Sequence, residues 1–123
     1  MEKRRIMVID DESIVCKMSK TVLEREGYEV ETFLNGKPAL ERLDEQNFDL
    51  VITDLKMKGI DGMEILKKIK SRSPDTKVIM ITAFASLDAA IEAIRGKVDD
   101  FFPKPIEIKG LKERVKKLLG DEG

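Results

Sequence analysis

The chain has 123 residues, 41% hydrophobic and 38% charged, with a formal net charge of −1, which fits one globular domain. It contains no histidine, and this excludes a Ser-His-Asp triad, a histidine zinc site and a phosphohistidine carrier role within the chain. The balanced charge, the lack of an apolar run of membrane-spanning length and the single cysteine, Cys16, predict a cytoplasmic protein without a disulfide and without direct nucleic-acid or membrane partners.

Strand patterns alternate with helix patterns along the chain in five units of roughly 20–25 residues. The predicted strands are 5–9, 29–33, 49–53, 77–81 and 100–102. The predicted helices are 13–26, a helix through 38–43, a helix through 63–69, 86–95 and a last helix that ends near 119. We expect residues 1–120 to form one domain, followed by a short tail, 121–123, without an effector domain.

The composition of the strands predicts their order in the sheet. Glu29–Phe33 alternates polar and apolar residues, as an edge strand does, whereas 49–53 is nearly all apolar, as a strand covered on both faces should be. Strand–helix–strand units form right-handed crossovers between parallel strands. We therefore predict an α/β fold of the flavodoxin-like (βα)5 type, a parallel sheet of order 2-1-3-4-5 with helices on both faces.

Polar residues stand where the predicted strands end. They are Asp10 and Asp11 after the first strand, Asp54 after the third, Thr82 after the fourth and Lys104 after the fifth. The carboxyl ends of parallel strands share one edge, where ligands bind. Three neighbouring acids raise one another's pKa values and therefore require a cation. Mg²⁺, or Mn²⁺, with a lysine and a hydroxyl opposite makes a site that handles phosphoryl groups.

With these residues the chain resembles the receiver domain of a two-component response regulator. The matching motifs, in order, are Val8-Ile9-Asp10-Asp11-Glu12, Gly27-Tyr28-Glu29-Val30, Asp49-Leu50-Val51-Ile52-Thr53-Asp54, Asp61-Gly62, Ile81-Thr82-Ala83 and Lys104-Pro105. The segments Ser86-Leu87-Asp88-Ala89-Ala90 and Phe102-Pro103-Lys104-Pro105 are similar to receivers of the nitrogen-regulator type, which drive enhancer-binding ATPases. The resemblance covers nearly the whole chain.

The resemblance implies roles for single residues. Asp54 corresponds to the phosphoacceptor, which attacks a phosphoryl group as a nucleophile, and Lys104 to the lysine that contacts the phosphoryl oxygens. Thr82 is similar to the switch hydroxyl and Phe101 to the switch aromatic residue. Because Phe101 and Phe102 are adjacent on a strand, they face opposite sides, so one is expected in the core and the other free to move.

For the metal, the resemblance implies carboxylate ligands from Asp11 and Asp54, a contact through water from Asp10 and a backbone carbonyl from Lys56. Mg²⁺ prefers six oxygens and keeps several waters, which suits an open acidic site. No other cofactor is expected.

The implied function is phosphorelay signalling rather than turnover of a substrate. The domain would take the phosphoryl group from the phosphohistidine of a sensor kinase or a phosphotransfer protein, and would assist both this transfer and its own dephosphorylation. The signal would leave through the face made by the fourth helix, fifth strand and fifth helix, toward a downstream protein, an effector domain or a second copy. The sequence leaves open whether the receiver is free-standing or part of a longer regulator.

Three positions depart from the family pattern. Met57-Lys58-Gly59 stands where Met-Pro-Gly is usual, and Gly96-Lys97-Val98 where Gly-Ala usually precedes the fifth strand. Phe101 lacks the phenol hydroxyl that some relatives have. These departures bear on the choice of partner more than on the chemistry.

Other interpretations of the same residues remain. Asp10 and Asp11 could cap the helix that begins at Ser13, and Asp54 could be a turn residue. An aspartyl-phosphate hydrolase of the haloacid-dehalogenase type would carry its nucleophile after the first strand, not the third. A flavin-binding module would need a first loop that welcomes phosphate, which Asp10-Asp11-Glu12 would repel. A receiver that only binds partners, without metal, should have lost some of these acids.

Overall fold

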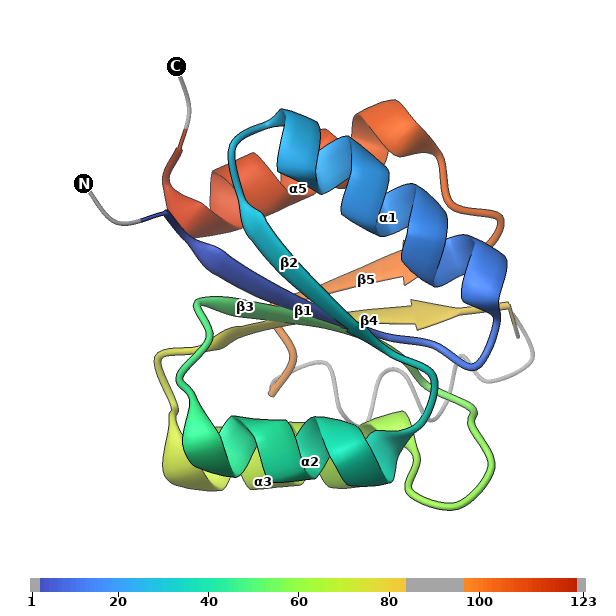
Figure 1. The fold of residues 1–123 in the computed structure, drawn as a ribbon, viewed down its shortest axis with the longest axis vertical. Coiled ribbons are helices and arrows are strands. Elements are labelled where there is room, and N and C mark those ends of the chain that lie inside the picture. The colour runs from blue at the N-terminus through green and yellow to red at the C-terminus, as the bar shows by residue number, and fades with distance from the viewer. Residues whose placement is uncertain (1–2, 84–96, 122–123) are drawn as a thin grey trace.

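The computed structural model describes residues 3–83 and 97–121, so the predicted helix 86–95 lies outside the described residues. The elements are β1 (Arg5–Ile9), α1 (Ser13–Arg25), β2 (Glu29–Phe33), α2 (Gly36–Glu45), β3 (Leu50–Asp54), α3 (Gly62–Arg72), β4 (Lys77–Thr82), β5 (Asp100–Pro103) and α5 (Ile108–Leu119). Strands and helices alternate as predicted from β1 to β4, and α5 follows β5 as predicted (Figure 1).

The sheet has five parallel strands in the order β2-β1-β3-β4-β5, which confirms the predicted flavodoxin-like topology. β1 and β2 have the predicted bounds, whereas β3, β4 and β5 each end one residue later than predicted. β3 includes Asp54 because this residue pairs with Ile81 in the ladder, which continues with a bond of 2.9 Å from Leu55 N to the Ile81 oxygen. β4 and β5 extend likewise to Thr82 and Pro103, which pair with each other.

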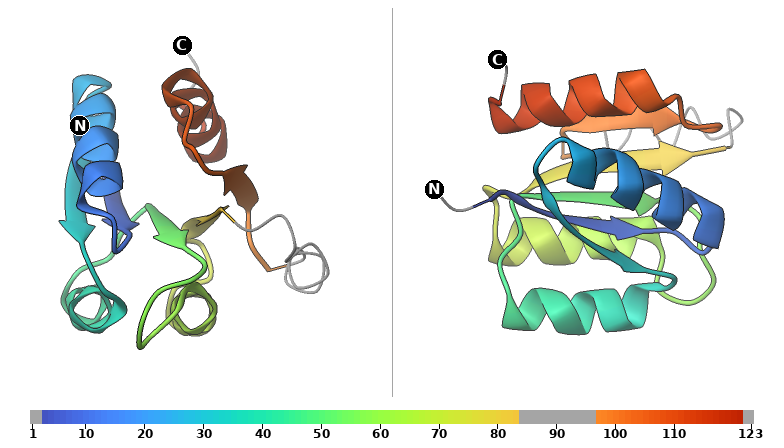
Figure 2. Two further views of the ribbon diagram at one scale, coloured as in Figure 1. Left: turned by 90° about the vertical axis from the view of Figure 1, so that its right-hand side faces the viewer. Right: turned by 45° about the horizontal axis from the view of Figure 1, so that its top comes forward.

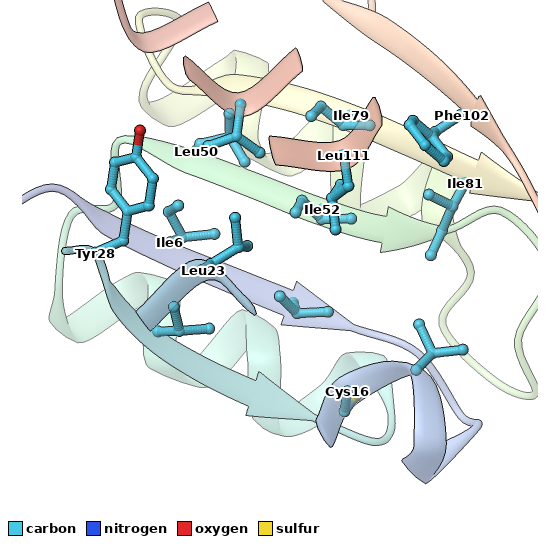
Figure 3. Packing of buried hydrophobic residues seen from close by; sticks show 14 of the residues in the cluster. Ile6, Cys16, Leu23, Tyr28, Leu50, Ile52, Ile79, Ile81, Phe102 and Leu111 are labelled. Atoms are coloured by element: carbon cyan, nitrogen blue, oxygen red, sulfur yellow. The ribbon is translucent and has the colours of Figure 1, made fainter. Parts of the chain in front are cut away.

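Helices cover both faces of the sheet, α1 and α5 on one side and α2 and α3 on the other (Figures 1 and 2). The α1/α5 side buries Leu23, Tyr28, Ile52 and Leu111 in one cluster (Figure 3). A second apolar cluster lies between the sheet and α2/α3. β1, β3 and β4 contribute to both clusters, as strands covered on both faces must. Their burial on both faces holds in place the residues at their carboxyl ends.

The two adjacent phenylalanines of β5 face opposite sides, as predicted. Phe102 is 4% exposed and belongs to the α1/α5 cluster, whereas Phe101 is half-buried against the α2/α3 cluster. Phe102 is therefore the core residue of the pair, and Phe101 is the more exposed one; its predicted movement stays a prediction. Among the residues described, no helix is long and apolar enough to cross a lipid bilayer.

Candidate phosphoacceptor site

Three carboxylates meet at the carboxyl edge of the sheet. Asp10 and Asp11 follow β1 and Asp54 ends β3, its neighbour in the sheet, so that one oxygen of each lies within 4.8 Å of the others. Asp10 is fully buried and Asp54 is 5% exposed, whereas Asp11 is open to solvent. The sequence-based prediction that these acids converge is therefore confirmed.

The ammonium group of Lys104 lies among the carboxylates. Its Nζ is 3.0 Å from Oδ2 of Asp10, 3.1 Å from Oδ2 of Asp54 and 2.6 Å from Oε1 of Glu12. The Lys104 side chain is only 10% exposed, and the Lys104–Pro105 peptide bond is cis. β5 thus brings a buried cation to the phosphoacceptor candidate at the end of β3.

Burial controls the charges of this site. It raises the pKa of Asp10 and of Asp54 above the ordinary range, and the nearby Lys104 ammonium offsets only part of this. Burial also acts to lower the pKa of Lys104, but the adjacent carboxylates of Glu12, Asp10 and Asp54 outweigh it and raise that pKa. Lys104 stays protonated, and burial makes the charged form of each acid costly in free energy.

One oxygen of the buried acid pair has no hydrogen bond among the described residues. Oδ1 of Asp10 accepts from the backbone N–H of Glu12 at 2.8 Å, but Oδ2 accepts none, although it lies at ion-pair distance from Lys104. A buried carboxylate oxygen without a hydrogen bond, beside two further carboxylates, is the donor set of a hard cation such as Mg²⁺. The residues present therefore fit this metal.

Helix capping explains little of the acidic pair. The residue that precedes the first turn of α1 is Glu12, whose side chain makes no capping hydrogen bond. Asp10 binds the N–H of Glu12 with one oxygen only. Lys56 also lies at the site, because its backbone N–H donates to Oδ1 of Asp54 at 3.4 Å. The predicted metal contact through the Lys56 carbonyl stays a prediction.

The loop between Asp54 and α3 is held by two local devices. A Cβ at Gly62 would collide with the backbone oxygen of Asp54, so only glycine allows this approach. Asp61 caps α3 by accepting from the N–H groups of Met63 and Glu64, at 3.0 and 3.1 Å. The Asp61-Gly62 motif therefore holds the start of α3 close to the backbone of Asp54, the phosphoacceptor candidate. Gly59 in the same loop has φ of 77°, which favours glycine.

Thr82 and Phe101 lie on one face of the sheet. Thr82 is 8% exposed and ends β4, two residues after Met80, and Met80 pairs with Phe101. Residues two apart on a strand share a face, so Thr82 and Phe101 are diagonal neighbours. The backbone oxygen of Thr82 accepts from the N–H of Lys104 at 2.9 Å, which ties the end of β4 to the site.

Glu12 is the site residue that sequence reasoning missed. The sequence indicates Glu12 only as part of the motif Asp10-Asp11-Glu12. Neither its residue type nor its spacing shows that its carboxylate contacts a lysine 92 positions away. The available signal was its place, since Glu12 follows the strand next to β3 at the edge where Lys104 was expected.

A parallel sheet of this strand order, with acids and a buried lysine gathered at its switch point, defines a flavodoxin-like domain with an acidic carboxyl edge. The chain belongs to the response regulator receiver domain family, whose sequence model matches residues 6–116. This assignment is at odds with the dehalogenase-type and flavin-binding interpretations of the sequence.

The relatives confirm that the chain resembles receivers of the nitrogen-regulator type. The chain is 36% identical to the transcriptional regulatory protein ZraR of Klebsiella oxytoca over 96% of its own length, and 37% identical to the DNA-binding transcriptional regulator NtrC of Escherichia coli over 88%. It spans only 27% of the length of ZraR and 23% of NtrC.

Solved structures show the same fold. A CheY-like receiver domain protein from Methanospirillum hungatei aligns with a TM-score of 0.89 and 31% identity, covering 98% of this chain and 96% of that one. The response regulator TrrA of Thermotoga maritima, solved in complex with Mg²⁺ and BeF, aligns with a TM-score of 0.84 and 38% identity, covering 94% and 99%.

Proposed function

We propose that this receiver accepts a phosphoryl group on Asp54 from the phosphohistidine of a sensor kinase or phosphotransfer protein. The observation that carries the proposal is the convergence of Lys104 and the acids on one carboxylate, Asp54, at the end of the central strand. The Mg²⁺–BeF complex of TrrA supports it, since that structural relative takes up the metal together with BeF.

In the transfer, a carboxylate oxygen of Asp54 attacks phosphorus. The bond between phosphorus and the donor nitrogen breaks, and its electron pair stays on the departing imidazole. Lys104 offers a positive charge to the phosphoryl oxygens from its place beside Asp54. Asp11 and Asp54 would hold Mg²⁺ directly, Asp10 through water, and the bound ion would supply charge neutralisation and alignment of the reacting oxygens.

After transfer, the same residues would assist hydrolysis of the aspartyl phosphate, so the signal decays without a separate enzyme. The output would run through Thr82 and Phe101 to the face of β5 and α5, where an effector domain, a partner protein or a second copy would bind. The predicted contribution of 86–95 to this face lies outside the described residues. Cytoplasmic location and the absence of direct nucleic-acid contact stay predictions.

Phosphate incorporation tests the chemistry. Acetyl phosphate with Mg²⁺ should add one phosphoryl group, stable in acid and labile in base, and a chelator should prevent it. Asp54→Asn should not be labelled, whereas Asp75→Asn, which changes an exposed acid in the turn before β4, should be labelled normally. Full labelling of Asp54→Asn, or labelling indifferent to chelator, would contradict the proposal.

Amide NMR tests the output. Beryllofluoride with Mg²⁺ should shift signals in β5 and α5 while leaving α2 nearly unchanged, because a shift of Thr82 opens space for Phe101 and moves a pre-existing equilibrium. Thr82→Ala should still bind beryllofluoride but lose most of the distant shifts. Changes confined to the residues around Asp54 would show that the signal is read at the acidic site itself.

A further inference from the structure

The ammonium group of Lys104 is surrounded by three carboxylates, of which Glu12 and Asp54 accept hydrogen bonds from it and Asp10 pairs with it by charge. A lysine side chain carries three N–H donors, and each of three carboxylates lies within reach of Nζ, at 3.0 Å (Asp10), 2.6 Å (Glu12) and 3.1 Å (Asp54). A phosphoryl group on Asp54 brings new oxygens that need this cation. The phosphoryl group would therefore compete for Lys104 with the carboxylates that already surround it.

The three carboxylates differ in how readily they can be released. The side chains of Asp10 and Asp54 are 0% and 7% exposed, so water cannot replace the lysine there. The side chain of Glu12 is 55% exposed, and water can solvate its carboxylate as soon as Lys104 moves away. Glu12 is therefore the partner whose release costs the least.

The Glu12 backbone does not move with its side chain. Its N–H donates to Oδ1 of Asp10 at 2.8 Å, and its carbonyl oxygen accepts from Val15 N at 3.1 Å in the first turn of α1. The backbone of Glu12 is therefore held in place, while its exposed side chain can contact Lys104 or rotate away from it.

We propose, on the basis of the function proposed above, that Glu12 is a positioning residue that competes with the incoming phosphoryl group for Lys104. In the resting domain Glu12 occupies the lysine donor that the phosphoryl oxygens need. Its charge also opposes the approach of an anion. Glu12 therefore slows phosphorylation and weakens the binding of phosphoryl analogues, and its residue type sets how readily this receiver is switched on.

Two variants separate the contact from the charge. Glu12→Gln keeps the length of the side chain and removes the charge, whereas Glu12→Asp keeps the charge and shortens the reach, and both lose the close ion pair with Lys104. Glu64→Gln removes an exposed charge in the first turn of α3 and serves as the matched control. Thermal melting of each variant verifies that it folds.

The measurements are the rate of phosphorylation by limiting acetyl phosphate, the beryllofluoride affinity by amide NMR with Mg²⁺ saturating, and the affinity for Mg²⁺ alone. Both Glu12 variants should be phosphorylated about two- to fivefold faster and bind beryllofluoride tighter by a similar factor, the size of a partly exposed ion pair. Glu64→Gln should match the wild type, and Glu12→Asp should bind Mg²⁺ as the wild type does.

The outcomes are distinct. A gain in Glu12→Gln alone would show that net charge, not the contact, is responsible, and unchanged or slower reaction in both variants would show that Glu12 does not compete. Loss of Mg²⁺ affinity in Glu12→Asp would make Glu12 part of the metal site. Each of these overturns the inference, while labelling of wild type but not of Asp54→Asn would leave the proposed function standing.

Discussion

The two edges of the sheet both hold partly or fully buried acids, but they satisfy them differently. At the amino edge, Asp49 accepts from the N–H of Arg5 at 2.8 Å, and Asp99 accepts from the N–H of Val78 at 2.7 Å and from Lys70 at 3.0 Å. At the carboxyl edge, Oδ2 of Asp10 accepts no hydrogen bond among the described residues and is balanced only by the Lys104 ammonium at 3.0 Å. One edge satisfies its acids with hydrogen bonds from the fold itself, whereas the other gathers several acids around a single lysine.

The largest effect is expected from breaking the amino edge. Asp99→Ala leaves the N–H of Val78 and the ammonium of Lys70 without their carboxylate, and should lower the free energy of unfolding by about 3 kcal/mol. Urea unfolding measures this, with the exposed Asp75→Ala as control. A loss no larger than that of the control would mean that the network at this edge is not what stabilises it.

Magnesium binding should stabilise the domain through the acids of the carboxyl edge and not through those of the amino edge. At a hundredfold excess over its dissociation constant, one bound ion stabilises the folded state by about 2.7 kcal/mol. Wild type and Asp99→Ala should both gain this, whereas Asp11→Ala should gain almost nothing and should melt slightly higher than wild type in chelator, because one repelling charge is gone. If Asp11→Ala melted lower in chelator yet kept the full gain, Asp11 would have to be a structural residue.

Removing a charge at the carboxyl edge should stabilise the apo domain. Asp10→Asn keeps an oxygen for the N–H of Glu12 and relieves the burial of a charge, so it should raise the free energy of unfolding by about 1–2 kcal/mol in chelator at pH 7. Equilibrium unfolding in urea measures it. A less stable Asp10→Asn would indicate that the ion pair with Lys104 outweighs the cost of burial.

The pH dependence of that difference has a defined sign. Burial raises the pKa of Asp10 in the folded protein, so the folded state binds this proton more tightly than the unfolded state. The charged Asp10 therefore destabilises the fold increasingly as pH rises from about 4, its unfolded value, through the folded pKa. The advantage of Asp10→Asn, which does not titrate, should grow over this window and then level off, and an advantage that shrinks with rising pH would contradict the assignment.

The smallest effect tests a polar group with no evident use. Ser19 is fully buried in α1, and its hydroxyl has no hydrogen bond among the described residues. Ser19→Ala should raise stability by about 1 kcal/mol, while the exposed Ser71→Ala on α3 measures the part due to helix propensity alone. Phosphorylation should be unchanged in both variants. Slower labelling of Ser19→Ala would assign this hydroxyl to the functional side of the comparison.

The sequence predicted the sheet because apolar alternation is local and strong in these strands. Strand order followed from the polar face of Glu29–Phe33, and the convergence of Asp10, Asp11 and Asp54 followed from the order. Alternation also placed Phe101 and Phe102 on opposite faces, but only packing decides that Phe102 is the core residue.

What the sequence could not provide depends on side-chain reach between distant segments. The contact from Glu12 to Lys104 and the bonds from Asp99 to Lys70 and Val78 join residues that no periodicity links. Asp49 and Asp99 share one local signal, an acid directly before a strand, and its meaning emerges only when the neighbouring strand supplies the N–H.

The guanidinium of Arg4 donates to the carbonyl oxygen of Leu119 at 2.8 Å, so the segment leading into β1 touches the end of α5. Both described ends of the chain emerge at the amino edge, away from the acidic site (Figure 1). Neighbouring termini are what domain insertion requires, so this domain can be inserted into a surface loop of a host protein. In such a chimera the acidic edge would lie opposite the two attachment points. Phosphorylation of Asp54, as proposed above, could then control the activity of the host protein.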